Sequence, residues 1–225
     1  MNIGYKTTAL LAVDIQNDFC PAYTDKSGRE YPAGALPVSR GQEVIDPLNS
    51  LAEIIHRRGG KVMATQDWHP SDHISFASFH IGKKAGDTII VPPAIQQTLW
   101  PDHCIQNTEG AAFHSELNIK LIDMVFRKGC RQNIDSYSAF FENDRCTPTD
   151  LNGYLKEQGI DTLLVGGLAL DYCVLYSVVD SLRLGYKTFV IKEACMGIDI
   201  PAGSINNAVD QMKELGAVFV SVSDF

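Results

Sequence analysis

The segment LLVGGLALDYCVLYSVVDSL, residues 163–182, indicates both a fold class and a candidate nucleophile. Its first residues are apolar without polar alternation, which is typical of a strand buried on both faces. Gly166 and Gly167 follow and permit a tight turn. The remainder carries apolar residues at helical spacing. This succession of strand, turn and helix favours an α/β protein and places Cys173 in the first turn of the helix.

Short apolar runs like the one at residues 161–167 recur along the chain. The other predicted strands are residues 8–14, 60–66, 123–126, 187–192 and 217–222. Apolar residues at helical spacing predict helices at residues 44–58, 149–158, 174–184 and 204–215. Because the strands lack polar alternation and are separated by helices, we expect a mostly parallel sheet that is covered on both faces.

The expected fold is therefore α/β, a three-layer α/β/α sandwich with a mostly parallel, six-stranded, Rossmann-like sheet. A chain of 225 residues fits one hydrophobic core, so residues 1–225 are predicted to form a single domain. Residues 21–40 and 68–108 break the alternation of strands and helices, and we expect long surface loops there. Domains of this kind often associate, so a homo-oligomer is expected.

The composition is that of a globular protein and argues against two classes of partner. The chain has 19 Lys and Arg against 27 Asp and Glu, a net charge of −8, and no basic run exceeds two residues. Nucleic-acid binding is therefore not expected. The apolar stretch Ala9–Val13 is too short for a signal peptide or a membrane span, so we expect no membrane partner and a cytoplasmic location. The six cysteines form no C-x-x-C pair and are expected to be thiols.

Chemically active residues end four of the predicted strands, at the sheet edge where such folds bind ligands. Asp14 and Asp67 end two of them, Lys128 lies near the end of the third, and Cys173 follows the fourth. Amides at a helix N-terminus lower a thiol pKa and can bind an oxyanion. A lysine would favour the thiolate, and a carboxylate could move the thiol proton to a leaving amine. This placement favours acyl transfer by Cys173, with Asp14 and Lys128, over a buried structural cysteine.

A possible metal site follows the predicted strand at residues 60–66. Asp67 and His69 are two residues apart, so in an extended segment they face the same side. His103 is the candidate third ligand. Two histidines and one carboxylate suit Zn²⁺, Fe²⁺ or Mn²⁺. The alternative is that these side chains form hydrogen bonds within the loop.

Seven segments resemble the isochorismatase-like cysteine hydrolases, and within them the nicotinamidase branch. They are ALLAVDIQNDFCP (9–21), GALPV (34–38), TQDWHPSDHISFAS (65–78), LWPDHCIQNTEGAAFH (99–114), FRKG (126–129), IDSYSAFFEN (134–143) and GLALDYCV (167–174). The resemblance implies an amide hydrolase that converts nicotinamide to nicotinate and ammonia in NAD salvage, through a cysteine thioester. It implies that the catalytic residues are Cys173, Asp14 and Lys128. It also implies one divalent metal ion, with zinc expected and iron or manganese as alternatives, bound by Asp67, His69 and His103.

The resemblance further implies how the substrate is held. The metal would hold the pyridine nitrogen, and the ring would lie in a pocket lined by Phe19, Trp100 and Tyr137. The bond between Leu168 and Ala169 would be cis, and the amides of Ala169 and Cys173 would form the oxyanion hole.

The chain departs from the family pattern at three places. Leu170 stands where relatives usually carry Thr, which would alter a hydrogen bond next to the nucleophile. Where some relatives have a further His or Glu ligand, this chain offers Ser75 and Ser78, while His73 is expected to order the loop. The segment 21–40 is longer than in compact relatives.

Three other functions are compatible with parts of this pattern. They are a related cysteine amidohydrolase or isochorismatase-type hydrolase with another small substrate, a binding module without catalysis, and a zinc-stabilised structural protein. The intact set of candidate metal ligands argues against the first. The presence of Asp14, Lys128 and Cys173 together argues against the second. Unfolding on chelation, without any reaction of the cysteine, would favour the third.

Overall fold

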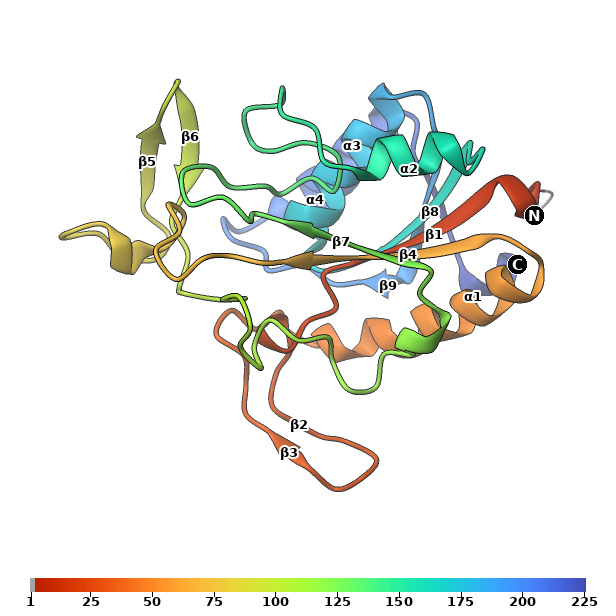
Figure 1. Cartoon of the computed structure of the whole chain (residues 1–225), viewed down its shortest axis with the longest axis horizontal. Coiled ribbons are helices and arrows are strands. Elements are labelled where there is room, and N and C mark those ends of the chain that lie inside the picture. The colour runs from red at the N-terminus through yellow and green to blue at the C-terminus, as the bar shows by residue number, and fades with distance from the viewer. Residues whose placement is uncertain (1–2) are drawn as a thin grey trace.

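A computed structural model describes residues 3–225. Within them, parallel strands form a 6-stranded sheet in the order β10-β9-β8-β1-β4-β7 (Figure 1). The strands are β1 (Thr8–Val13), β4 (Lys61–Asp67), β7 (Met124–Lys128), β8 (Thr162–Gly167), β9 (Lys187–Cys195) and β10 (Val218–Val220). The predicted α/β fold with a six-stranded parallel sheet is confirmed.

Helices cover both faces of this sheet, as Figure 1 shows. They are α1 (Ile45–Arg57), α2 (Leu151–Glu157), α3 (Leu175–Arg183) and α4 (Ser204–Glu214). On one face, Leu48 and Ile55 of α1 belong to the same apolar cluster as Leu10 of β1. The cluster on the other face joins β1 to the remaining three helices. Each fully buried leucine or isoleucine contributes about 1.5–3 kcal/mol, so both layers are held mainly by apolar burial.

The sheet register brings the ends of four strands together. Val13 of β1 pairs with Gly167 of β8, and Asp67 of β4 pairs with Lys128 of β7. A Cβ atom on Gly167 would lie 2.1 Å from the carbonyl oxygen of Val13, so only glycine permits this close approach. Asp14 follows directly after β1. The carboxyl edge of the sheet therefore collects the residues that the sequence singled out.

Two predicted strands have different bounds in the structure. The strand expected at residues 123–126 is β7, Met124–Lys128, because its pairing with β4 continues to Asp67. Asp123 lies before the strand, and its carboxylate accepts a hydrogen bond from the Val62 N–H at 2.8 Å. The strand expected at residues 187–192 extends to Cys195, which pairs with Gly167. The strand expected at residues 217–222 is the shorter β10, and all remaining elements agree with prediction to within two residues at each end.

The two predicted loops contain small antiparallel hairpins, which project from the body in Figure 1. The first pairs β2 (Tyr23–Thr24) with β3 (Glu30–Tyr31), and the second pairs β5 (Thr88–Val91) with β6 (Ile95–Thr98). Short 3-10 helices lie at Tyr5–Thr7, Asn17–Phe19, Gly41–Val44, Ala77–Phe79, Ile119–Leu121 and Val222–Asp224.

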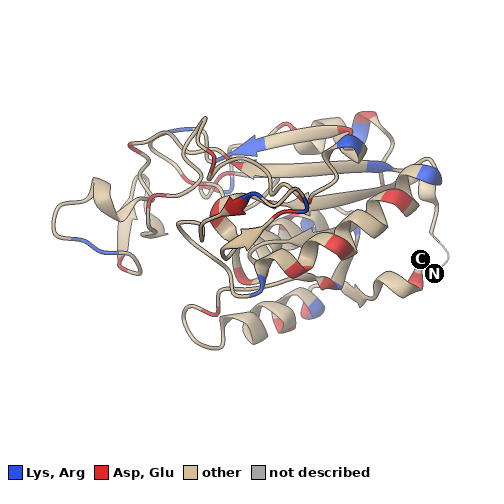
Figure 2. Ribbon diagram, turned by 90° about the horizontal axis from the view of Figure 1, so that it is seen from below, with Lys and Arg blue, Asp and Glu red and all other residues tan. Residues whose placement is uncertain are grey.

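Acidic and basic residues are interspersed over the helices and loops in Figure 2. All six cysteines are free thiols. Among residues 3–225, no helix combines the length and apolarity that a bilayer crossing requires.

Candidate active site and metal centre

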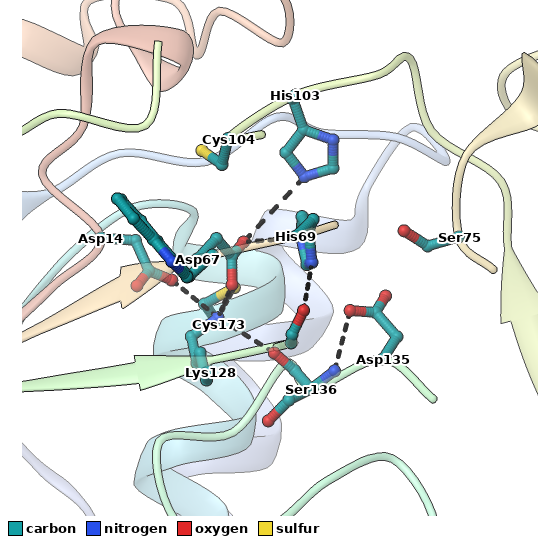
Figure 3. A network of polar contacts seen from close by, with 12 residues as sticks. Asp14, Asp67, His69, Ser75, His103, Cys104, Lys128, Asp135, Ser136 and Cys173 are labelled. Carbon is teal, nitrogen blue, oxygen red and sulfur yellow. Dashed lines mark hydrogen bonds and ion pairs between the residues drawn. The ribbon is translucent and has the colours of Figure 1, made fainter. Parts of the chain in front are cut away.

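The ammonium group of Lys128 is the common contact of the candidate catalytic residues (Figure 3). Its Nζ donates to Cys173 Sγ at 3.2 Å, to the Ser136 carbonyl at 3.0 Å and to Asp67 Oδ1 at 2.5 Å. Asp14 Oδ2 lies 2.9 Å from the same nitrogen. Burial disfavours the charge of Lys128, but Asp14 and Asp67 outweigh it and raise the pKa of Lys128 well above its usual value. The lysine is therefore a cation that joins the thiol to two carboxylates.

Asp14 is held by the end of β4. It has a φ of 52°, so the chain turns sharply as it leaves β1. The Thr65 hydroxyl donates to Asp14 Oδ1 at 2.6 Å and accepts from the Asp14 N–H at 3.1 Å. Burial raises the pKa of Asp14 to about 6, although the charge of Lys128 opposes this shift. At neutral pH most of this carboxyl group is ionised and can accept a proton.

Cys173 lies in a π-helical turn, Leu170–Val174, that leads into α3. Burial raises the pKa of its thiol well above the usual value, and the nearby charge of Lys128 offsets only part of this effect. The expectation of a lowered thiol pKa at the helix start is therefore wrong in direction, because removal from water outweighs the favourable charges. The raised pKa favours the protonated thiol. Asp14 offers an oxygen within 4.8 Å of Sγ.

The second cluster consists of Asp67, His69 and His103, all buried. Asp67 Oδ2 lies 3.7 Å from His69 Nε2 and 4.0 Å from His103 Nε2. The Nδ1 atom of each ring faces a main-chain carbonyl, that of Gly129 at 2.9 Å and that of Pro101 at 2.8 Å. A carbonyl can only accept, so Nδ1 carries a proton, and in the neutral ring the lone pair of Nε2 points toward Asp67.

The charges in this cluster fit a divalent cation. Burial opposes ionisation of Asp67, but Lys128 and His69 hold the pKa of its carboxyl group far below the usual range. Burial disfavours the protonated ring of His69, yet Asp67 outweighs it and raises the pKa of His69. A positive charge between these groups is thus favoured, and carboxylate and imidazole donors with carbonyl-oriented rings suit zinc and similar ions.

Gly129 permits the position of His69, and its role was not predicted. A Cβ atom at this residue would lie 2.3 Å from His69 Cε1, closer than real Cβ atoms approach a neighbour. The residue also has a φ of 61°, which favours glycine. The glycine of the FRKG segment, directly after Lys128, was the available signal.

A pocket joins the two clusters. It is lined by the three aromatic residues Phe19, Trp100 and Tyr137, and by Leu36, Asp67, His69, His103, Asp135, Ala169, Tyr172, Cys173 and Ile198. Trp100 Nε1 donates to the Tyr137 hydroxyl at 3.1 Å, which fixes these two rings against each other. Leu36, Asp135, Tyr172 and Ile198 were not predicted as pocket residues. Tyr172 adjoins Cys173 and Asp135 lies two residues before Tyr137, so their proximity to predicted site residues was the available signal.

The segment before the nucleophile has the predicted backbone. The bond between Leu168 and Ala169 is cis. Leu170 donates its N–H to the Met196 carbonyl at 2.8 Å, and its side chain belongs to the same apolar cluster as Cys173. Leu170 is thus part of the hydrophobic core in this chain.

Of the three residues after His69 that were considered as further ligands, two are buried beside His69 and one lies at the surface. His73 stacks on His69 with ring centroids 4.1 Å apart, and its Nδ1 lies 2.7 Å from Ser75 Oγ. Ser75 is completely buried, whereas the exposed Ser78 donates to Asp102 at 2.6 Å. His73 and Ser75 therefore support one side of the cluster of Asp67, His69 and His103, and Ser78 is engaged at the surface.

Comparisons with known proteins extend these observations. The family described as "Isochorismatase domain" matches residues 8–224. The nicotinamidase of Escherichia coli (strain K12) is 43% identical over 220 residues, which are 96% of this chain and 96% of that protein.

Two solved structures share the fold. The yeast nicotinamidase bound to the inhibitor nicotinaldehyde has a TM-score of 0.84 and 31% identity, covering 95% of this chain and 99% of that chain. The pyrazinamidase of Pyrococcus horikoshii in complex with zinc has a TM-score of 0.74 and 30% identity, covering 96% of this chain and 99% of that chain. The chain therefore belongs to the isochorismatase family, in which it groups with the nicotinamidases.

Proposed function

We propose that this chain hydrolyses nicotinamide to nicotinate and ammonia through a thioester on Cys173. One observation carries this proposal: the ammonium of Lys128 contacts the sulfur of Cys173 and the carboxylates of both Asp14 and Asp67. Nucleophile, proton acceptor and metal cluster thus converge at one pocket. The family membership and the similarity to nicotinamidases support the assignment of the substrate.

The first half of the reaction forms the thioester. Asp14 takes the proton of the Cys173 thiol as Sγ attacks the carboxamide carbon. Lys128 stabilises the Cys173 thiolate and the Asp14 carboxylate, because its ammonium group contacts both. Asp14 then passes the proton to the amide nitrogen, the C–N bond breaks, and ammonia leaves.

The second half releases the acid. Asp14, now ionised again, takes a proton from a water molecule. At the same time the oxygen of that water attacks the thioester carbon. The S–C bond breaks, nicotinate forms, and Sγ recovers the proton. In both halves the N–H groups of Ala169 and Cys173 are the proposed oxyanion donors. The Ala169 N–H, which borders the pocket, has no acceptor among residues 3–225.

Asp67, His69 and His103 would hold one divalent metal ion, with zinc expected and iron or manganese as alternatives. The zinc complex of the Pyrococcus horikoshii relative supports this choice. When bound, the ion supplies a Lewis acid for the pyridine nitrogen. Phe19, Trp100 and Tyr137 are proposed to enclose the ring, so that the carboxamide faces Cys173. Such positioning can contribute about 7–11 kcal/mol to catalysis.

The test is ammonia release from nicotinamide by the purified, zinc-loaded chain. Cys173→Ala should abolish release, whereas Cys195→Ala, a buried thiol outside the pocket, should retain it. Full turnover by Cys173→Ala would refute the mechanism. Benzamide lacks the ring nitrogen and serves as the matched substrate. If the chain hydrolysed it as well as nicotinamide, and His103→Ala were fully active, a general small-amide hydrolase would replace the nicotinamidase assignment.

Three properties of the whole protein complete the proposal. Residues 3–225 form a single domain, which the family match over residues 8–224 supports; the first two residues of the predicted range 1–225 lie outside the described residues. The enzyme acts in the cytoplasm, which six free thiols support. It forms a homo-oligomer, and light scattering of the purified protein would measure its mass.

A further inference from the structure

The side chain of Gln16 is completely buried beside the metal cluster, yet it belongs neither to the proposed catalytic residues nor to the proposed ligands. Its Nε2 donates to the carbonyl oxygens of Asp67 at 2.8 Å and of Ala111 at 2.9 Å. Its Oε1 accepts from the Asp67 N–H, also at 2.8 Å. One side chain therefore satisfies both main-chain polar groups of Asp67.

Asp67 needs these hydrogen bonds because the pairing of β1 with β4 ends before it. β1 and β4 pair in parallel as far as Ala12 and Ala64. The chain then turns at Asp14, and β1 offers no backbone to Asp67, whose other neighbour is Lys128 of β7. The carboxamide of Gln16 takes the place of the missing peptide group, because both groups present an N–H donor and a carbonyl acceptor.

The position of Asp67 affects two functions at once. Its Oδ1 accepts the hydrogen bond of Lys128, the residue that contacts the Cys173 sulfur. Its Oδ2 faces the Nε2 atoms of His69 and His103. A rotation or shift of the Asp67 main chain would move both oxygens.

We propose that Gln16 is a positioning residue, which fixes the main chain of Asp67 so that one carboxylate oxygen serves Lys128 and the other binds the divalent cation. This inference rests on the metal site of the proposed function. It assigns to Gln16 an effect on metal affinity and ligand geometry, in addition to its effect on stability.

Gln66 offers a matched control. It adjoins Asp67 on β4, is buried, and donates to the same Ala111 carbonyl at 3.1 Å. Within the described residues it makes no hydrogen bond to the main chain of Asp67. Gln66→Met thus removes a buried carboxamide from the same place without releasing the metal ligand.

The experiment measures Zn²⁺ binding by the metal-free, full-length protein in competition with a chromophoric chelator. Gln16→Met should weaken zinc binding about 10–100-fold, as loss of groups that orient metal ligands does. Gln66→Met should stay within about twofold of the wild type, since no ligand is released. With Co²⁺ in place of zinc, the visible absorption bands should shift in Gln16→Met and remain in Gln66→Met.

Gln16→Asn keeps the experiment decisive if the Met variant does not fold, because its shorter side chain remains polar but cannot reach Asp67. Unchanged zinc affinity and Co²⁺ bands in a folded Gln16 variant would overturn the proposal, even if that variant melted at a lower temperature. Asp67→Asn distinguishes this failure from that of the metal site. If Asp67→Asn also bound zinc like the wild type, Asp67 would not be a ligand and both proposals would fall.

Discussion

Gly129→Ala tests the metal centre through a single added carbon atom. The new Cβ would lie 2.3 Å from Cε1 and 2.6 Å from Nδ1 of His69. Because the ring must move away, the hydrogen bond from His69 Nδ1 to the Gly129 carbonyl, now 2.9 Å, is lost. We expect zinc affinity to fall about 10–100-fold, the range found when the group that orients a metal-bound histidine is removed. Each factor of ten corresponds to about 1.4 kcal/mol.

The substitution also places a side chain in the left-handed region, which by itself costs about 1–2 kcal/mol. Gly159→Ala isolates that cost. Gly159 has a φ of 67°, close to the 61° of Gly129, and a Cβ atom there meets nothing within 4 Å. Both variants should lose similar stability from backbone strain, measured as the free energy of unfolding in urea. Only Gly129→Ala should lose zinc affinity, and with it the ability to bind nicotinamide at low concentration.

The assay is zinc competition on the metal-free proteins, followed by the KM for nicotinamide at saturating zinc. If Gly129→Ala bound zinc as tightly as Gly159→Ala, the ring of His69 would not need its present position, and its assignment as a metal ligand would be refuted.

Three further predictions concern the charged groups. Lys128→Met leaves the buried carboxylates of Asp14 and Asp67 without their cation, so the free energy of unfolding at pH 7 should fall by about 3–5 kcal/mol; urea titration checks this, and unchanged stability would contradict the ion pairs. The value of kcat/KM should decline as the pH falls through about 6, because Asp14 must be ionised to take the thiol proton and its pKa is raised to about 6; a flat profile down to pH 4.5 would exclude Asp14 as the base. Removal of the metal by a chelator should abolish nicotinamide hydrolysis, and added zinc should restore it. His103→Ala should raise the KM for nicotinamide at least about tenfold through weakened metal binding. Full activity of the chelated protein would show that no metal is needed.

The raised thiol pKa changes how the site has to work. A cysteine that is already a thiolate would need no base for its attack. Burial of Cys173 favours its protonated form, so in the proposed mechanism the carboxylate of Asp14 accepts the thiol proton. Burial also raises the pKa of Asp14, which makes that carboxylate a better base near neutral pH. The same removal from water thus suppresses the free thiolate and strengthens the group that generates it.

The strand and helix pattern was predictable because it depends on local periodicity. Within the predicted strands 8–14 and 161–167, residues 9–13 and 163–167 are apolar without interruption, since both faces of their strands are covered. The hairpins of the two long loops were missed. Their strands are short, two and four residues each, and only the pairing between them marks them as strands.

The sequence alone determined the fold class and the identity of the residues at the carboxyl edge of the sheet. Strand ends can be read from the pattern, and the ends of parallel strands must meet at one edge. Tertiary structure decided how those residues act on each other. Three contacts depend on distances between segments far apart in the chain. Lys128 contacts both Asp14 and Cys173, Gly129 leaves room for the ring of His69, and Gln16 forms hydrogen bonds with the main chain of Asp67. The pKa of Cys173 depends on burial, which arises only when those segments pack together and exclude water.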